Sequence, residues 1–138
     1  MSIDLAVQKA IRDRLIATLA VTALVPASGI LDRNERPAPS PSIILGESQT
    51  VDEGTSLRRA ISRVYHTIHV WKREASTEGV KAISGAIRTA IHAGRLDLGT
   101  GFHAADSFVS GTRFLRDPDG ETSHGVVTVQ VLVHEVAP

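Results

Sequence analysis

The sequence of 138 residues contains no cysteine. Disulfide bonds and thiolate chemistry are therefore excluded, and cysteine usage leaves the redox compartment open. The chain also lacks an excess of either charge, because 15 basic residues balance 15 acidic ones. A free-standing nucleic-acid-binding protein usually has a basic excess, so this class is less favoured, although a local basic patch could still exist. Zero net charge gives little repulsion between copies, which suits a protein that works within an assembly.

Long apolar runs are missing as well. No run approaches the roughly 18 residues of a membrane-spanning helix. Charged residues also interrupt the N-terminal segment and exclude a signal peptide; they are Asp4, Lys9, Arg12, Asp13 and Arg14. We therefore expect a soluble protein that is made in the cytoplasm and has no membrane partner. The length fits one domain, residues 1–138, and neither an internal repeat nor a low-complexity tract is visible.

The clearest pattern that is present lies in the last third of the chain. Residues 113–133 contain two strand-like runs joined by the turn Asp117–Gly120, in which a proline presets φ and a glycine accepts a positive φ. A period of two after this turn predicts a strand in the core of a sheet. The apolar face of that strand consists of Val127, Val129, Val131 and Val133.

Two segments have helical periodicity. Ser2 can cap a helix that runs to about Ala23, and Pro26 ends it. Ser76 can cap a second helix, with Gly94 at the position that favours glycine after a helix. The apolar stripes of both helices should pack in the core. From the first helix we expect Val7, Ile11 and Leu15, and from the second Ile83 and Ile87.

Four more strands are predicted, at 29–33, 42–49, 63–72 and 101–115. The proline-rich tract 37–41 cannot join a ladder and is predicted to be an extended connector. The strand at 101–115 would be longer than most, so we expect a bulge or break near Ser110-Gly111. If that strand is continuous, one parity is shared by Phe102, Phe108 and Phe114. The order of elements predicts an α+β fold, a mostly antiparallel sheet of about five strands with two amphipathic helices on one face.

The segment 50–62 is the least regular part of the chain and is predicted to be an exposed loop or a long, mobile hairpin arm. The simplest interpretation of the basic residues in and near it is a solvated loop and strand end. The functional interpretation is an assembly contact or a surface that faces nucleic acid, because a ring multiplies the charge of one copy. These basic residues are Arg58, Arg59, Arg63, Lys72 and Arg73.

No motif for catalysis or metal binding stands out. Of the six histidines, His66 and His69 would point to opposite faces of a strand, and His103, His124 and His134 come with no HExxH motif. The sequence has no G-x-S-x-G elbow, and its Gly-Thr-Gly tripeptide is too short to cradle a phosphate. The Asp-Pro-Asp-Gly turn lacks the later glutamate of a calcium loop. We expect no cofactor, no metal and no enzymatic activity.

In their order along the chain, these segments resemble the tail-completion proteins, also called tail terminators, of long-tailed bacteriophages and phage-derived gene transfer agents. The resemblance covers nearly the whole chain, although the segment 50–62 has no motif to carry over. It is carried by DLAVQKAIRDRL, VPASGILDR, PSIILGE, HTIHVWKREASTEGVKAISGAI and FLRDPDGETSHGVVTVQVLV. The resemblance implies a ring, commonly a hexamer, that caps the finished tail tube, stops its polymerisation and presents a surface to the head connector. It also implies an opening that lets DNA pass, and it brings no catalytic residues.

We therefore expect a structural protein of a virion or gene transfer agent particle. Its partners would be copies of itself, the tail tube protein and the head or neck connector. The alternatives are another head–tail joining protein, such as a neck or head-completion protein, and a small hydrolase or ligand-binding domain with a concave pocket. Tyr65 and Trp71 share strand parity and could lie in the core or at an interface; the core is favoured, since a lone tryptophan tends to pack against a helix. The contact with neighbouring subunits or the tube is expected at Thr50, Val51, Asp52, Glu53, Leu57, Arg58, Arg59 and Arg63.

Overall fold

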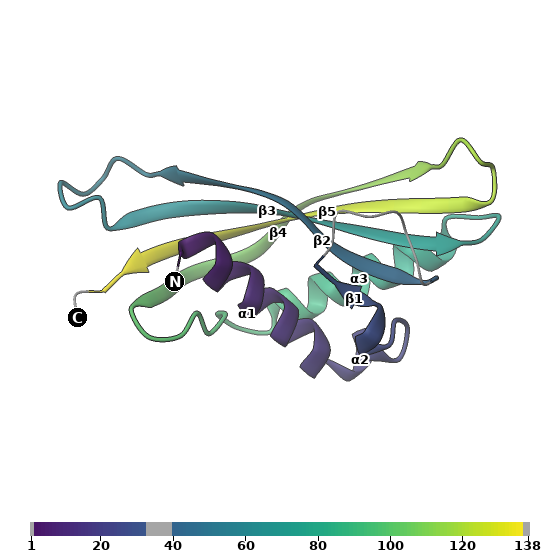
Figure 1. Ribbon diagram of the computed structural model, residues 1–138, viewed down its shortest axis with the longest axis horizontal. Helices are drawn as coiled ribbons and strands as arrows, with labels where there is room; N and C mark the ends of the chain where they lie inside the picture. Colours follow the sequence, from purple (N-terminus) through teal and green to yellow (C-terminus); the bar gives the residue numbers. More distant parts are fainter. Residues whose placement is uncertain (1, 33–39, 137–138) are drawn as a thin grey trace.

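The computed structural model describes residues 2–32 and 40–136, and its five strands form one sheet in the order β1-β2-β3-β5-β4 (Figure 1). The α+β fold is confirmed, but the sheet is mixed, because β1 pairs with β2 in parallel while the other three pairs are antiparallel. The predicted strand at 29–33 shortens to Ile30–Leu31, and its residue 33 and most of the connector 37–41 lie outside the described residues. The elements are α1 (Ile3–Ala17), α2 (Leu19–Thr22), a 3-10 helix (Ala27–Gly29), β1 (Ile30–Leu31), β2 (Ser42–Asp52), β3 (Ile61–Arg73), α3 (Glu78–His92), β4 (Phe102–Arg116) and β5 (Thr122–Glu135).

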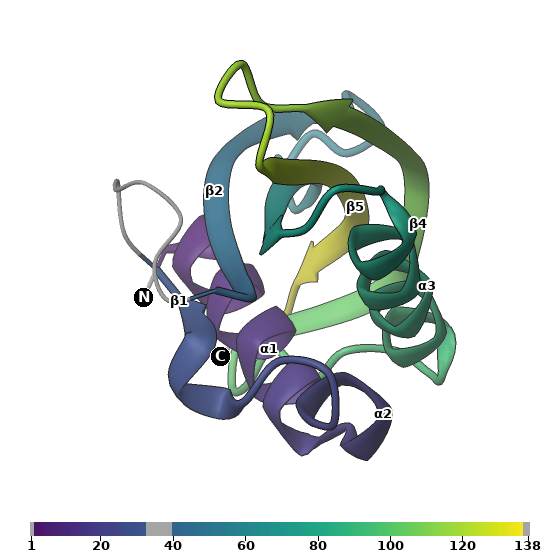
Figure 2. The ribbon, with the colours of Figure 1, turned by 90° about the vertical axis from the view of Figure 1, so that its right-hand side faces the viewer.

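The three helices lie on one side of the sheet, as the end-on view in Figure 2 shows, and a single apolar cluster joins them to it. The burial pattern of the central strand β3 alternates, so that even-numbered side chains face the helices and odd-numbered ones face away. We call the side that faces away the open face. All eight residues expected in the core belong to the cluster and are at most 2% exposed: Val7, Ile11, Leu15, Ile83, Ile87, Val127, Val129 and Val131.

The favoured assignment of two aromatic residues to the core was wrong. Tyr65 and Trp71 are only half-buried and lie on the open face. Buried and half-buried positions alternate along β3, so these side chains point away from the core that Val64 and Val70 enter. Both parities of this strand are rich in apolar side chains, so the sequence alone did not distinguish the two faces.

The first helix ends earlier than predicted. Thr18 has an extended backbone, with φ −96° and ψ 112°, and its hydroxyl donates to the carbonyl of Arg14 at 2.7 Å. The prediction of one helix to about Ala23 was therefore wrong. The break turns the chain so that Val21 enters the core, whereas Leu19, which an unbroken stripe would bury, is exposed.

The second long helix, α3, is held at both ends by charged side chains. At its start, the carboxylate of Glu74 accepts hydrogen bonds from the backbone N–H groups of Gly79 and Val80 at 2.8 and 3.0 Å. Ser76 accepts only from the N–H of Glu78 and is not at the N-cap position, so its predicted role as the cap was wrong. A carboxylate at this position also suits the positive end of the helix dipole.

At the other end of α3, the guanidinium of Arg14 reaches across from α1. It donates to the carbonyls of Ala90, Gly94 and Arg95 at 2.8 to 3.1 Å. These carbonyls lie at the end of α3, where backbone acceptors lack partners within the helix. Arg14 therefore ties the two long helices together.

Bulges interrupt the long outer strands. The register of β4 against β5 shifts between Ala104 and Asp106 and again between Val109 and Gly111. The break predicted near Ser110-Gly111 is thus confirmed, and a second one precedes it. The shifts rotate the strand, so Phe102 and Phe114 pack against the core while Phe108 lies opposite Gln130 of the open face. The shared parity of the three phenylalanines is therefore lost.

The two hairpins project from opposite ends of the sheet, beyond the helical layer (Figure 1). The β2–β3 connection, residues 53–60, is called the tip loop, and it lies beside the last residues of β5, where the N–H of Glu135 donates to the carbonyl of Ala60 at 2.8 Å. The β4–β5 connection, residues 117–121, is called the acidic turn. Between them, β3 and β5 pair over their whole length, from Ile61 opposite His134 to Arg73 opposite Thr122.

Candidate assembly surfaces

The predicted interface segment 50–62 is mostly a hairpin and only partly a loop. Thr50, Val51 and Asp52 continue β2 and pair with residues 62–64 of β3, so of the two predicted forms, an exposed loop or a hairpin arm, these residues adopt the hairpin. Their side chains are exposed nonetheless, and Val51 is 41% exposed. Thr50 donates from its hydroxyl to the carboxylate of Asp4, which places the N-terminal turn of α1 against this hairpin.

Two ion pairs organise the base of the tip loop. Arg63 of β3 donates to Glu53 at 2.6 Å and to Gln130 at 3.4 Å, so it braces the hairpin against β5. Arg59 lies 3.4 Å from the carboxylate of Asp52. Four of the residues predicted to form the interface thus lie together as two ion pairs.

The outermost part of the tip loop is an ordered turn from Ser56 to Arg59. The N–H of Arg59 donates to the carbonyl of Ser56 at 3.0 Å, and the N–H of Arg58 donates to the Ser56 hydroxyl at 3.2 Å. Arg59 has a positive φ of 55°, which few non-glycine residues adopt. The turn leaves Leu57 98% exposed at its corner, with Arg58 beside it.

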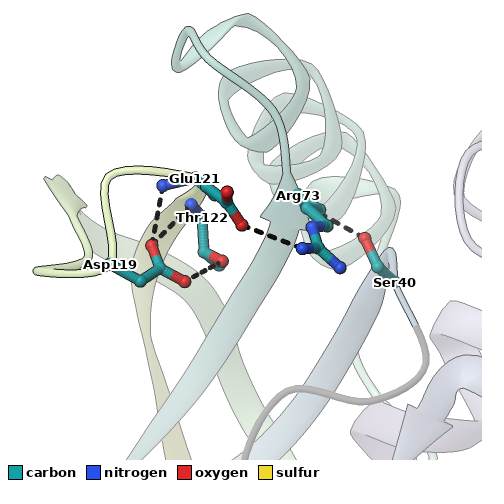
Figure 3. Close-up of polar contacts among 5 residues, drawn as sticks. All are labelled: Ser40, Arg73, Asp119, Glu121 and Thr122. Carbon is teal, nitrogen blue, oxygen red and sulfur yellow. Dashed lines mark hydrogen bonds and ion pairs between the residues drawn. The ribbon is translucent and has the colours of Figure 1, made fainter.

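The acidic turn at the opposite end is held by one carboxylate (Figure 3). Asp119 accepts from the N–H groups of Glu121 and Thr122 and from the Thr122 hydroxyl, at 2.8 to 2.9 Å, and these hydrogen bonds lower the pKa of Asp119. Glu121 in turn pairs with Arg73 at 2.8 Å, and the backbone N–H of Arg73 donates to the hydroxyl of Ser40. The turn therefore has a fixed shape and carries negative charge at the far end of the sheet.

A polar cluster on the open face was not predicted from the sequence. Nε2 of His69 donates to Glu47 at 2.9 Å, so in the neutral ring Nδ1 accepts from Nε2 of His124 at 2.8 Å. The ring of His124 stacks on Trp71, with centroids 3.7 Å apart and planes 5° apart. Burial lowers the pKa of His124 to about 4, and the positive charges of a protonated His69 and of Arg113 act in the same direction. The hydrogen bond from His69 lowers the pKa of Glu47.

The cluster depends on a glycine in the β2 bulge. A Cβ atom at Gly46 would lie 2.7 Å from Cδ2 of His69, so only glycine leaves room for that ring. His69 and His124 are 55 residues apart in sequence and meet through the register of β3 and β5. The signal that could have indicated the cluster is the shared parity of His69 and Trp71 along one strand.

His66 is the buried counterpart of His69. As predicted from strand parity, the two rings lie on opposite faces, and His66 is 0% exposed on the helix side. Among the described residues its two ring nitrogens have no hydrogen-bond partner. Burial lowers the pKa of His66, because charging the ring in the core is unfavourable.

The described part of the chain holds no group of three or more histidine, cysteine, aspartate or glutamate side chains that could bind a metal ion. A groove of about 430 Å³ separates α1 from the α3–β4 connection, as a ligand-binding domain would require. Charged groups that line this groove already make contacts within the protein: Lys9 pairs with Asp13 at 2.9 Å, and Arg14 binds the end of α3. Within residues 2–32 and 40–136, the helices are too short or too polar to cross a membrane.

Two of the three comparisons with known proteins found matches. A family model described as "Tail completion protein gp17" matches residues 9–134. A chain of a structure described as "Virion of native gene transfer agent (GTA) particle" is similar, with a TM-score of 0.77, 19% identity, and coverage of 92% of this chain and 93% of that one. A structure of the gp17 protein of bacteriophage SPP1 is similar, with a TM-score of 0.59, 22% identity, and coverage of 97% and 91%. None of the curated proteins compared matches the chain.

Proposed function

The chain belongs to the tail completion protein gp17 family, and on that premise we propose that it is a ring-forming tail terminator. Membership gives it a structural role in the tail or at the head–tail joint. The finer proposal is that copies of the chain, six in the form that the resemblance implies, close into a ring on the finished tail tube. The ring stops further addition of tube subunits and offers its other side to the head or neck connector. One domain, residues 1–138, carries this function.

The observation that carries the proposal is the family match over residues 9–134, which runs from within α1 to near the end of β5 and so includes most of the fold. The likeness to a chain of a gene transfer agent particle and to a phage gp17 protein supports a location in such a particle. Both likenesses are below 25% identity and by themselves concern the fold.

The shape of the molecule supports a role in assembly. The tip loop and the acidic turn lie at opposite ends of the sheet, where neither is covered by a helix (Figure 1). The open face leaves Tyr65 and Trp71 half-buried and available to a partner. A subunit with two different ends can repeat one contact around a ring, while its remaining faces bind different partners along the axis. We propose that Leu57, Arg58 and Arg59 of the tip loop contact a neighbouring subunit or the tube, and that DNA passes through the opening.

Electron microscopy of particles that lack the protein tests the proposal. Overlong or ragged tails are the result expected for a terminator. Normal tails together with heads that leak DNA would refute the terminator and favour the neck or head-completion alternative. Turnover or specific binding of a small molecule in the groove beside α1 would favour the third alternative, a ligand-binding domain.

A loop variant tests the ring. Replacement of residues 53–60 by a two-residue turn should leave a folded monomer that no longer forms rings, as measured by circular dichroism and native mass spectrometry. A control in which the same eight positions are glycine and serine keeps the length of the backbone and tests whether the side chains are needed. Normal ring formation by the shortened variant would refute the role of the tip loop.

A further inference from the structure

The two ends of the molecule differ in a way that makes them complementary. The tip loop, with the sequence EGTSLRRA, contains two arginines and one glutamate, and that glutamate is bound to Arg63 at 2.6 Å. The acidic turn, with the sequence DPDGE, contains three acidic residues and no basic one. When the pairs Arg59–Asp52, Arg63–Glu53 and Arg73–Glu121 are set aside, the tip loop keeps the positive charge of Arg58 and the acidic turn keeps the negative charges of Asp117 and Asp119.

The negative end also has a hollow with a mixed apolar and charged lining, which we call the notch. It is a cleft of about 240 Å³ beside the first turn of α3, and the N–H of Glu74 on its rim donates to the carbonyl of Glu121 in the acidic turn at 2.9 Å. Leu24 is 42% exposed there. The lining residues without charge are Leu24, Gly79, Ala82 and Ile83, and the charged ones, which we call the rim, are Lys72, Glu74 and Glu78.

The rim carries the carboxylates of Glu74 and Glu78 and the ammonium group of Lys72, which is half-buried. Glu74 is committed to the backbone of Gly79 and Val80 at the start of α3. Glu78, in the first helical turn, is exposed to solvent. A basic group that reaches the rim from outside would therefore meet Glu78.

The tip loop cannot reach the notch of its own chain. The two are separated by the 13 residues of β3, which span about 40 Å. A contact between them must therefore join two copies. Because it uses different surfaces on the two partners, repetition of the contact gives a closed ring or an open chain rather than a two-fold dimer.

We propose that Leu57 of one copy inserts into the notch of the next copy, with Arg58 beside Glu78. The inference rests on the proposed ring and names its subunit contact. The Ser56–Arg59 turn holds Leu57 outward before binding, so little conformational freedom is lost in the contact. The apolar side chain fills the cleft, and the opposite charges fix the orientation.

Cysteine cross-linking tests the contact, and the absence of native cysteine gives a clean background. A Leu57→Cys variant mixed with a Leu24→Cys variant should give a covalent dimer with a short bis-maleimide, and the double variant should give a ladder of oligomers. Leu5→Cys is the matched control, because Leu5 is also exposed but lies at the first turn of α1, away from the notch. Mixed with Leu57→Cys, it should give no dimer above the collision level.

Charge reversal provides a second readout. Arg58→Glu and Glu78→Arg should each weaken self-association at least about tenfold, measured by sedimentation velocity, because each places like charges together at the rim. The variant that carries both changes should recover the association of the unaltered chain. Circular dichroism confirms that each variant is folded.

The outcomes separate this contact from the ring itself. Rings that form in the unaltered chain and persist in Arg58→Glu, without cross-linking between positions 57 and 24, would overturn the contact and leave the proposed function standing. An unaltered chain that stays monomeric both in solution and on tail tubes would overturn the ring as well. Cross-linking together with rescue by the double reversal establishes the contact.

Discussion

Replacement of His66 by leucine should stabilise the protein. His66 is fully buried between Ser48 of β2 and Val129 of β5, and neither ring nitrogen makes a hydrogen bond of normal geometry among the described residues, although the nearby backbone of Thr67 acts on the pKa of the ring in the direction opposite to burial. A buried polar group without a hydrogen bond costs about 1–3 kcal/mol. Leucine is apolar and of similar size, so His66→Leu should raise the free energy of unfolding by about 1–3 kcal/mol at pH 7.5.

Urea unfolding measures this change, with the fluorescence of the single tryptophan, Trp71, and far-UV circular dichroism as probes. With a slope of about 1–3 kcal/mol per molar urea, the midpoint should rise by about 1 M while the slope stays constant. His103→Leu is the control, because His103 is exposed and its replacement should change stability by less than about 0.5 kcal/mol.

The same variant has a signature in its pH dependence. Burial lowers the pKa of His66 in the folded state, so the unfolded chain binds a proton more readily, at its ordinary pKa of about 6.5. The stability of the unaltered protein should therefore fall as the pH falls below about 6.5, and part of this loss should disappear in His66→Leu. A variant that is less stable than the parent at pH 7.5, with an unchanged pH profile, would mean that the ring has a native partner, and the reasoning would fail.

Three further changes test other parts of the fold. Arg14→Ala removes three hydrogen bonds at the end of α3 and should lower the free energy of unfolding by about 2–3 kcal/mol, with a smaller loss in Arg14→Lys, by urea unfolding; equal stability of all three proteins would contradict the proposed bracing. Gly125→Val should cost about 1–3 kcal/mol in the same assay, because even a Cβ would lie 3.1 Å from the Ser84 hydroxyl, and a neutral result would show that α3 can shift freely. Gly46→Ala should displace the ring of His69 and alter the tryptophan fluorescence while unfolding cooperativity is kept; an unaltered spectrum would exclude the close approach.

The sequence was most informative where the local periodicity and the tertiary packing favour burial of the same side chains. The alternating valines of β5 and the apolar stripe of α3 each bury one face, so periodicity alone identified Val129 and Ile87 as core residues. The break at Thr18 could not be predicted in this way. Locally, Thr18 can adopt either a helical or an extended backbone conformation. The packing of the segment that follows determines which of the two is adopted.

The surfaces were harder to predict because they depend on register between distant strands. Tyr65 and Trp71 were assigned to the wrong face, since both faces of β3 are apolar enough to be buried. The cluster of His69 with His124 arises only when β3 and β5 align. The tip loop was located from its irregular composition, but the ion pair that organises its base, Arg63 with Glu53, required the structure.

The two bulges of β4 have a consequence for how copies of this chain can meet. An outermost strand of fifteen residues would be a template for indefinite strand addition, the route to amyloid-like fibres. The register shifts cut β4 into runs at 102–104, 106–109 and 111–116, and the ring of His92 already accepts the N–H of Val109 at 2.9 Å. At high local concentration, β4 therefore offers no long, regular edge for strand addition by another copy. Many copies can gather at one place without forming a continuous cross-β aggregate.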